Sequence, residues 1–406
     1  MSILLSVTKK YLKNYSGLPN EVWKAIGIHF LESVIVGLFY WLSLYFVNDL
    51  NIKVSTAGLI ISFYGFGAIF GSYVNGKLCD LVSSHYICAA NLLIVSIGYL
   101  LLIYLVKVEW LCLDVFILGF SGYGFITSNY FWILEKCNKN ENQKLKAINI
   151  LSAAANCGLS VSGIVVWALV PWGYKNLFWI SGVFLFGFAI YVFMKYSSQK
   201  NVTVPQIINQ KENSKNIYDP TLLYQILLIV FLTGLIIAQL SATYSLYIIN
   251  IFPQWGILGV TILFTLNSLL VVFFETPIGN FCNKYNKVML TGLGAFLIGF
   301  GMFALTLSSM FSIAVLGCII YTLGEILFFS MAQVICYEIG RPGSKGNSIG
   351  MFRMVYAGSR IVGPFAGGLL YTNISINSVW YISLLIGLFS LGACTLIKKQ
   401  SFSFSY

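Results

Sequence analysis

Five ionisable residues interrupt long apolar stretches of this sequence. They are Glu32, Glu275, Glu325, Arg353 and Arg360. If these stretches cross a membrane, each charge near the bilayer centre costs about 2.5–3.5 kcal/mol. A charge kept at such a cost usually binds a solute or carries a proton. We therefore take these residues as candidates for solute binding, proton coupling or gating.

Arg353 and Arg360 are seven residues apart, so a helix would place them on one face, two turns from each other. Glu325 and Arg360 both fall near the middle of their apolar stretches. An ion pair between them would lower the cost of burying each charge. We hypothesise that this pair couples movement of a solute to protons and that Arg353 helps to hold an anionic group. The alternative is a structural ion pair that locks two helices together.

Glu32 lies one turn beyond His29, and a carboxylate beside an imidazole can exchange protons near neutral pH. One interpretation has both side chains facing a central cavity. The other has Glu32 hydrogen-bonded to a neighbouring helix and His29 near the lipid headgroups. Glu275 precedes Thr276-Pro277, where a helix is expected to kink or end. We expect a structural or gating role for Glu275, in contact with Lys284 or Arg341.

Polar side chains also form stripes at helical spacing. Three stripes are visible: Tyr123, Thr127 and Tyr130; Gln239, Thr243 and Tyr247; and Thr261, Thr265, Ser268 and Glu275. A lipid-facing side would not be polar, so these faces are expected to meet in a water-accessible cavity. Tyr123 and Gln239 are our candidates for binding there. The alternative is hydrogen bonding between helices in a dry bundle.

Composition identifies the elements that must position these residues. Hydrophobic residues make up 58% of the 406 residues and charged residues only 9%, whereas soluble domains carry about 25% charged residues. Lipid must therefore cover most of the surface. Twelve apolar runs are long enough to cross a bilayer. They span residues 22–48, 56–79, 86–106, 109–134, 146–170, 176–195, 221–249, 255–278, 287–307, 310–337, 346–371 and 377–397.

The polar segments predict the division of the chain. Residues 1–20 form a basic cap, 21–195 and 221–398 form two bundles of six helices, 196–220 form a linker, and 399–406 form a tail. Most Lys and Arg residues fall on the side of the cap, linker and tail, which predicts that both termini are cytoplasmic. The same placement, in short clusters between apolar runs, argues against nucleic-acid binding despite the net charge of +11.

The two halves also resemble each other in sequence. Gly76-x-x-x-Asp80 matches Gly279-x-x-x-Asn283-Lys284 at an offset of 203 residues. Asn149 and Asn156 match Arg353 and Arg360 at an offset of 204. Repeated halves are typical of secondary transporters, which bind their substrate between the halves near the midplane.

These residues resemble the major facilitator superfamily, and the resemblance covers nearly the whole chain. Its signature after the second helix is G-x-x-x-D-R/K-x-G-R/K, of which Gly76 and Asp80 match while the basic residues are missing. In the second half, Gly279 and Lys284 match, but Asn283 replaces the acid. The resemblance implies a cytoplasmic latch between helices, and a glycine there would let two helices approach closely.

Two further elements carry the same resemblance. Gly324-Glu325 is similar to an element of the peptide- and drug-transporter branches. Gly363-Pro364, followed by Gly367-Gly368, is similar to an element that antiporter branches carry in the fifth helix, although here it lies in the eleventh. The resemblance thus implies an all-α membrane protein whose twelve transmembrane helices form two pseudo-symmetric six-helix bundles.

These observations favour a secondary active transporter that moves a small organic solute by alternating access, as a monomer in the inner membrane. Proton-coupled export is the leading interpretation, and proton-coupled uptake of an anionic nutrient, peptide or siderophore is the alternative. A membrane-embedded enzyme is a distant third, because the sequence has only two histidines and no clustered nucleophile and base. No glycine-rich ATP loop is present, and we expect no cofactor or metal.

Overall fold

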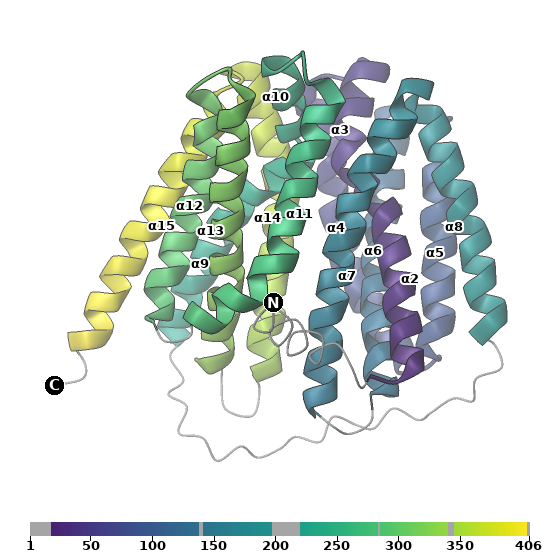
Figure 1. The fold of residues 1–406 in the computed structure, drawn as a ribbon, viewed down its shortest axis with the longest axis horizontal. Helices are drawn as coiled ribbons and strands as arrows, with labels where there is room; N and C mark the ends of the chain where they lie inside the picture. Colours follow the sequence, from purple (N-terminus) through teal and green to yellow (C-terminus); the bar gives the residue numbers. More distant parts are fainter. Residues whose placement is uncertain (1–17, 138–140, 197–219, 283–284, 340–344, 404–406) are drawn as a thin grey trace, which may run out of the picture.

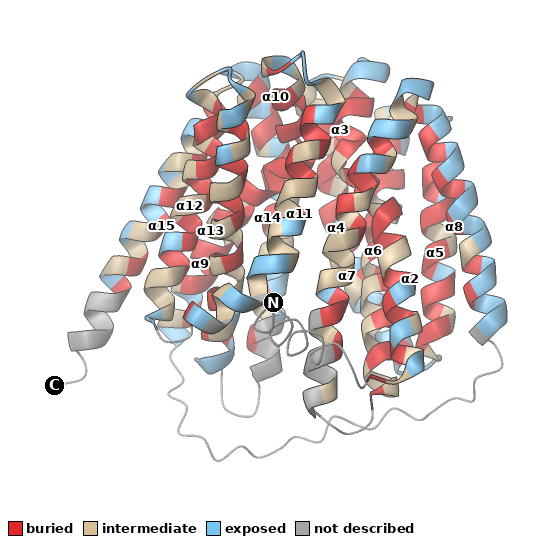
Figure 2. Ribbon diagram, viewed as in Figure 1, coloured by how far each residue is buried: buried red, intermediate tan, exposed pale blue. Residues whose placement is uncertain are grey.

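A computed structural model describes residues 18–137, 141–196, 220–282, 285–339 and 345–403. Within these ranges all regular structure is helical (Figure 1). The long helices run side by side, and buried residues concentrate between them (Figure 2). The predicted all-α fold of membrane-spanning helices is confirmed.

In the N-terminal half, the first long segment changes its helical type along its length, and five further long helices follow it. The elements are α2 (Asn20–Val36), η1 (Gly37–Trp41), α3 (Leu42–Leu44), η2 (Tyr45–Asp49), α4 (Val54–Cys79), α5 (Ser84–Leu101), α6 (Val108–Lys136), α7 (Glu141–Leu169), η3 (Val170–Trp172) and α8 (Tyr174–Tyr196).

The C-terminal half repeats this order. Its elements are α9 (Pro220–Ile237), η4 (Ala238–Ser241), α10 (Tyr244–Ile251), α11 (Gly256–Cys282), α12 (Lys287–Phe303), η5 (Ala304–Thr306), α13 (Phe311–Glu338), α14 (Lys345–Asn373) and α15 (Ser378–Ser403). Helix α11 continues through Pro277 to Cys282, so of the two expected outcomes at this proline, a kink or an end, the helix does not end there.

Eleven helical segments of the described chain are long and apolar enough to cross a membrane. The remaining long helix, α14, has 29 residues and so has the length to cross. It contains Arg353 and Arg360, together with several glycines and other polar residues, which lower its apolar content. This helix, the least apolar of the long helices, turns out to form part of the candidate site.

The ends of the helices define two sides of the molecule. We call the side where α2 begins and where α8 and α9 flank residues 197–219 the linker side, and the opposite side the far side (Figure 1). Within the first half, α4 packs on α6, α5 on α6 and α8, and α2 on α7. Within the second half, α12 packs on α13 and α15, α11 on α13, and α9 on α14.

Equivalent contacts occur in the two halves at an offset of about 203 residues. The Tyr45 hydroxyl donates to the Leu102 carbonyl at 2.9 Å, and the Tyr247 hydroxyl donates to the Leu305 carbonyl at 3.3 Å. The Ser84 hydroxyl donates to Glu135 at 2.9 Å. Lys287 forms an ion pair with Glu338 in the equivalent place. The sequence repeat therefore corresponds to a repeated pattern of contacts between helices.

The halves meet mainly through α4 against α14 and α7 against α11. Glycines allow this approach on the far side of the bundle. A Cβ atom at Gly58 would collide with the Pro364 carbonyl, and one at Gly65 would lie 2.8 Å from Cγ1 of Ile361. Thr261 donates to the Gly163 carbonyl at 3.1 Å across the second contact. We call these two contacts the far-side seam.

Candidate functional site

A small cavity, with a volume of about 90 Å³, lies between the two halves. Its wall combines two charged side chains with amides, hydroxyls and aromatic rings. The lining residues are Tyr40, Trp41, Asn156, Leu159, Ser162, Ile237, Ala238, Leu240, Ser241, Phe264, Asn267, Ser268, Glu325, Tyr356 and Arg360. The wall can therefore bind polar and aromatic parts of one small molecule.

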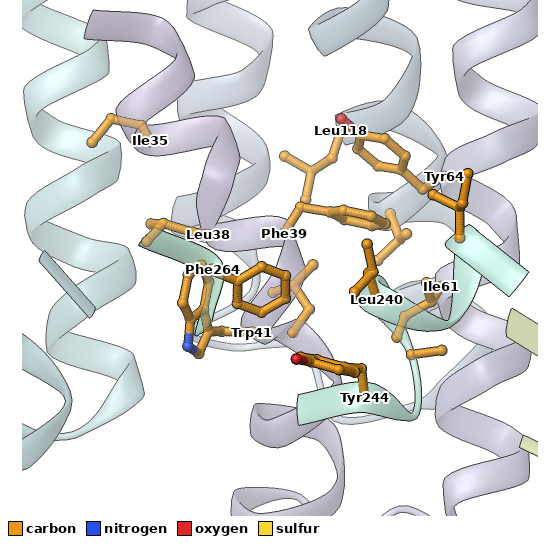
Figure 3. Packing of buried hydrophobic residues seen from close by; sticks show 14 of the residues in the cluster. Ile35, Leu38, Phe39, Trp41, Ile61, Tyr64, Leu118, Leu240, Tyr244 and Phe264 are labelled. Atoms are coloured by element: carbon orange, nitrogen blue, oxygen red, sulfur yellow. The ribbon is translucent and has the colours of Figure 1, made fainter. Parts of the chain in front are cut away.

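The first helix of each half changes to 3₁₀ geometry beside this cavity. The segments are η1, with Tyr40 and Trp41, and η4, with Ala238 and Ser241. Short 3₁₀ stretches within longer helices often mark functional hinges. Aromatic side chains from both halves meet there, and the rings of Trp41 and Phe264 have centroids 5.1 Å apart (Figure 3).

Arg360 extends from α14 across the junction of the halves. Its Nη1 atom donates to the hydroxyl of Tyr123 on α6 at 3.2 Å. Its guanidinium lies 6.0 Å from the ring centroid of Phe39 and 5.9 Å from that of Tyr64. These three side chains belong to the other half. Among the described residues, no carboxylate lies within ion-pair distance of Arg360.

Glu325 reaches the same cavity from α13, but it does not pair with Arg360. Its Oε2 atom accepts a hydrogen bond of 3.0 Å from Nδ2 of Asn267. The same Nδ2 donates to Thr322 Oγ1 at 2.9 Å, which fixes the orientation of the amide. The hypothesis of a direct Glu325–Arg360 ion pair is therefore wrong for this conformation, because Asn267 satisfies the carboxylate instead.

Glu32 and His29 do not face the cavity. They are 1% and 5% exposed, and neither lines the cavity wall. Their closest atoms, Glu32 Oε2 and His29 Nδ1, are 3.3 Å apart, and the His29 ring stacks on Phe125 of α6. Neither interpretation holds in this conformation, because both residues are buried away from the cavity and the described polar contacts of Glu32, to His29 and Ser33, are on its own helix.

The predicted polar stripes separate into two kinds. Gln239 donates to the Gly363 carbonyl at 2.8 Å and accepts from Thr243 at 3.0 Å. Tyr247 bonds Asn377 at 2.8 Å. This stripe therefore joins α9, η4 and α10 to other helices of the same half, and Gln239 does not line the cavity. On α11, Thr261 and Thr265 bond α7, whereas Ser268 lines the cavity.

Arg353 and Glu275 also lie outside the cavity wall. Arg353 is exposed on α14, two turns from Arg360 toward the linker side, and within electrostatic reach of Tyr130. Glu275 is partly buried on α11 and within electrostatic reach of Glu325. Its expected partners, Lys284 and Arg341, lie outside the described residues.

Comparison with known proteins decides the family. A model described as "Major Facilitator Superfamily" matches residues 25–364 and 226–401. The chain belongs to the major facilitator superfamily. It is similar to the uncharacterised MFS-type transporter YttB of Bacillus subtilis (strain 168), with 20% identity over 88% of this chain and 90% of that protein. The similarity to YqjV of the same organism is 30% identity over 32% of each chain.

Solved structures of this superfamily share the fold. The nucleoside transporter NupG matches with a TM-score of 0.73 and 17% sequence identity, over 96% of this chain and 100% of that chain. The resemblance that the sequence predicted is thus confirmed at the level of family and fold.

The superfamily signature residues on the linker side are loosely packed. Among the described residues, a Cβ atom at Gly76 would meet only Thr127, at 3.9 Å, and one at Gly279 would meet only Ser330, also at 3.9 Å. Asp80 ends α4 and is exposed. Close helix approach at these two glycines, as the resemblance implied, is therefore not present in this conformation. Lys284 lies outside the described residues.

The Gly363-Pro364 element lies where α14 contacts its neighbours. A Cβ atom at Gly363 would lie 2.6 Å from that of Ala238, and the Pro364 carbonyl packs against Gly58. The element therefore contributes to the far-side seam and to the contact with η4.

Three relevant residues were missed or undervalued in the sequence. Asn267 and Phe264 line the cavity. The sequence offered one signal for Asn267, namely a single amide within an apolar run. Asp114 is 2% exposed on α6, and both of its carboxylate oxygens lack a hydrogen-bond partner among the described residues. Its signal was the same as for Glu32, a single acid within an apolar run.

Proposed function

We propose that this member of the superfamily exports a small dipolar organic solute, one carrying both an anionic and a cationic group, in exchange for protons. The observation that carries the proposal is the presence of two opposite charges, Arg360 and Glu325, that share one cavity without pairing. A solute with complementary charges would satisfy both groups. A purely anionic or purely cationic solute would leave one of them uncompensated.

The surroundings of Arg360 support its role as the anion-binding group. Hydroxyls and aromatic faces stabilise the guanidinium, but they do not neutralise its charge. Its planar fork suits a carboxylate, which it can bind through two parallel hydrogen bonds. A bound anion would compete with Tyr123 for the guanidinium and so weaken a contact that joins the halves.

Glu325 supports the coupling to protons. As a carboxylate held by Asn267, it can attract the cationic group of the solute. Once protonated, it no longer offers a negative charge, so proton and solute compete for one site. Competition of this kind converts an inward proton gradient into outward movement of the solute, because only one of the two occupies the site at a time.

The arrangement of the halves supports alternating access. The glycine contacts close the far-side seam, whereas Gly76 and Gly279 on the linker side have no close partner in the part of the chain that the structure describes. We assign the linker side to the cytoplasm of a cell with an inner membrane, which makes this conformation inward-facing. To reach the outward-facing conformation, the protein must open the far-side seam. The 3₁₀ segments η1 and η4 would act as the hinges of this movement.

The test uses inside-out membrane vesicles with an acidic lumen and labelled solutes of three classes: dipolar, purely anionic and purely cationic. We expect dipolar solutes to accumulate in the lumen until a protonophore collapses the gradient. The Glu325→Gln variant should lose accumulation but keep exchange of labelled for unlabelled solute. Arg353→Gln, which removes an exposed cation from the same helix, is the matched control and should keep accumulation.

Other outcomes decide against the proposal. Transport of purely anionic solutes out of the lumen, driven by acid inside, would instead support proton-coupled uptake of an anionic nutrient, peptide or siderophore. Full accumulation by Glu325→Gln would show that this carboxylate does not couple transport to protons.

A further inference from the structure

A hollow on the far side of the molecule lies between the ends of η2 and α7 and the beginning of α11 (Figure 1). It has a volume of about 520 Å³ and opens to the surface. One wall belongs to the N-terminal half and includes Trp167 and Tyr174, and the other belongs to the C-terminal half and includes Trp255 and Leu258. We call it the far-side hollow. The described residues that line it are distinct from those that line the cavity of Arg360.

The far-side hollow lies at the depth expected for lipid headgroups. The apolar span Ile150–Trp172 ends beside it, and the span Gly256–Glu275 begins there. Trp167 and Trp255 on its wall are 49% and 38% exposed. Tryptophan side chains are enriched at membrane–water boundaries, because the ring is apolar and its N–H group is polar. A molecule in this hollow would therefore contact both hydrocarbon and water.

Two opposite charges at the hollow are not paired with each other. Asp49 ends η2 and lines the hollow, and Lys175 follows Tyr174 in the first turn of α8. Both are exposed, and Lys175 lies within electrostatic reach of Asp49. Among the described residues, neither takes part in an ion pair. Both charges are thus available to a ligand that carries a cation and an anion close together.

A buried hydroxyl at the same place also lacks a partner. Tyr174 is 5% exposed, and its Oη atom has no hydrogen-bond partner in the described part of the chain. This hydroxyl lies within electrostatic reach of Asp49. A buried polar atom without a partner calls for an explanation, and a phenol hydroxyl can donate a hydrogen bond. The hollow therefore offers one carboxylate acceptor, a cation and a hydroxyl donor.

We propose that the far-side hollow binds a phospholipid with a zwitterionic ammonium headgroup, of the phosphatidylethanolamine type. Asp49 accepts hydrogen bonds from the ammonium group, whereas Lys175 and Tyr174 donate to the phosphate. The acyl chains begin along Trp167 and Leu258. An anionic headgroup without an ammonium group would satisfy Lys175 but leave Asp49 beside a negative charge. The inference goes beyond the proposed function, because it concerns neither the solute nor the proton.

A lipid in this position would contact both halves of the protein. Trp167 belongs to α7 and Leu258 to α11. The same two helices form one contact of the far-side seam, where Thr261 bonds the Gly163 carbonyl. Opening of the seam, in the alternating access proposed above, would separate the two walls of the hollow. A bound lipid therefore stabilises the closed seam.

The test measures lipid binding to the full chain in detergent by native mass spectrometry. Phosphatidylethanolamine and phosphatidylglycerol with identical acyl chains are titrated separately, and we expect the wild type to prefer phosphatidylethanolamine. Asp49→Asn should remove this preference and lower the affinity for phosphatidylethanolamine about fivefold. That factor corresponds to about 1 kcal/mol, the upper end for a partly exposed charge pair. Lys175→Gln should weaken binding of both lipids, because both contain the phosphate.

Glu109→Gln is the matched control. It neutralises another acid in the first turn of a helix, α6, outside the hollow, and should bind both lipids as the wild type does. If Asp49→Asn does not fold, Lys175→Gln still tests the site. Equal binding of the two lipids by the wild type, or an unchanged preference in Asp49→Asn, would overturn the proposal. The measurement involves no transported solute, so either result is independent of whether dipolar solutes are exported.

Discussion

The two halves repeat one framework of contacts but place their charges differently. In the C-terminal half, Glu325 and Arg360 reach the cavity wall. In the N-terminal half, His29, Glu32 and Asp114 are buried inside the bundle, and the position equivalent to Arg360 holds the uncharged Asn156. The difference teaches that equivalent folds can place ionisable side chains in different surroundings, on the cavity wall in one half and inside the helix bundle in the other.

Exchanging the equivalent residues Arg360 and Asn156 is expected to have the largest effect. Arg360→Asn removes the only cation that lines the described cavity and should lower transport of a dipolar solute by about 100-fold, because loss of a buried charge partner costs 2–5 kcal/mol. Uptake into inside-out vesicles measures this effect. The Arg353→Gln variant should remain near wild-type activity. If the double variant Arg360→Asn with Asn156→Arg restored transport, it would not matter which half carries the charge.

Two equivalent glycines should respond very differently to alanine. A Cβ atom at Gly301 would lie 2.5 Å from the Tyr321 backbone nitrogen and 2.6 Å from the Gly317 carbonyl oxygen. At the equivalent Gly98, the nearest atom belongs to the Leu118 side chain, which can rotate away. We expect Gly301→Ala to destabilise the protein by about 1–3 kcal/mol and Gly98→Ala by less. Thermal unfolding in detergent measures both, and equal shifts would show that the two contacts are alike.

The equivalent tyrosines provide a milder comparison. Tyr247→Phe removes bonds to Leu305 and Asn377, whereas Tyr45→Phe removes one bond to Leu102. A buried group that loses its partner costs about 1–3 kcal/mol, so the loss should be larger for Tyr247→Phe. Unfolding temperatures of the two variants test this order. A larger loss for Tyr45→Phe would contradict it.

The smallest effect is expected on the linker side. Lys287→Ser converts the Lys287–Glu338 ion pair into the hydroxyl–carboxylate contact that Ser84 and Glu135 make in the other half. Partly exposed ion pairs contribute about 0–1 kcal/mol, and salt screens them. The change in unfolding temperature should therefore be slight and smaller still at high salt. A large shift that salt does not reduce would mean that the pair has a role beyond surface attraction.

The positions of the helices could be predicted because a bilayer demands long apolar runs. The predicted run 346–371 corresponds to α14, although Arg353 and Arg360 interrupt it. The placement of single side chains could not be predicted in the same way. The one-turn spacing of His29 and Glu32 predicts that they lie side by side, but whether they face the cavity or the bundle depends on how α2 is rotated against its neighbours, which apolar content does not encode.

The partners of two buried amides could not be predicted from the sequence for the same reason. Gln239 and Asn267 both lie in apolar runs, yet Gln239 bonds the α14 backbone and Asn267 bonds Glu325. Residue type and spacing show that each needs a polar partner. They do not show whether that partner is structural or part of the site, because the partner comes from a helix distant in sequence.

The polar character of α14 has a consequence for biogenesis. A segment with two arginines near its middle enters lipid poorly on its own, and its main contacts are with α4, synthesised near the start of the chain, and with α9. We therefore expect this helix to insert stably only when α4 and α9 are already in the membrane. Deleting α9 or the glycines of α4 that contact α14 should then reduce the amount of correctly inserted protein, and not only its activity.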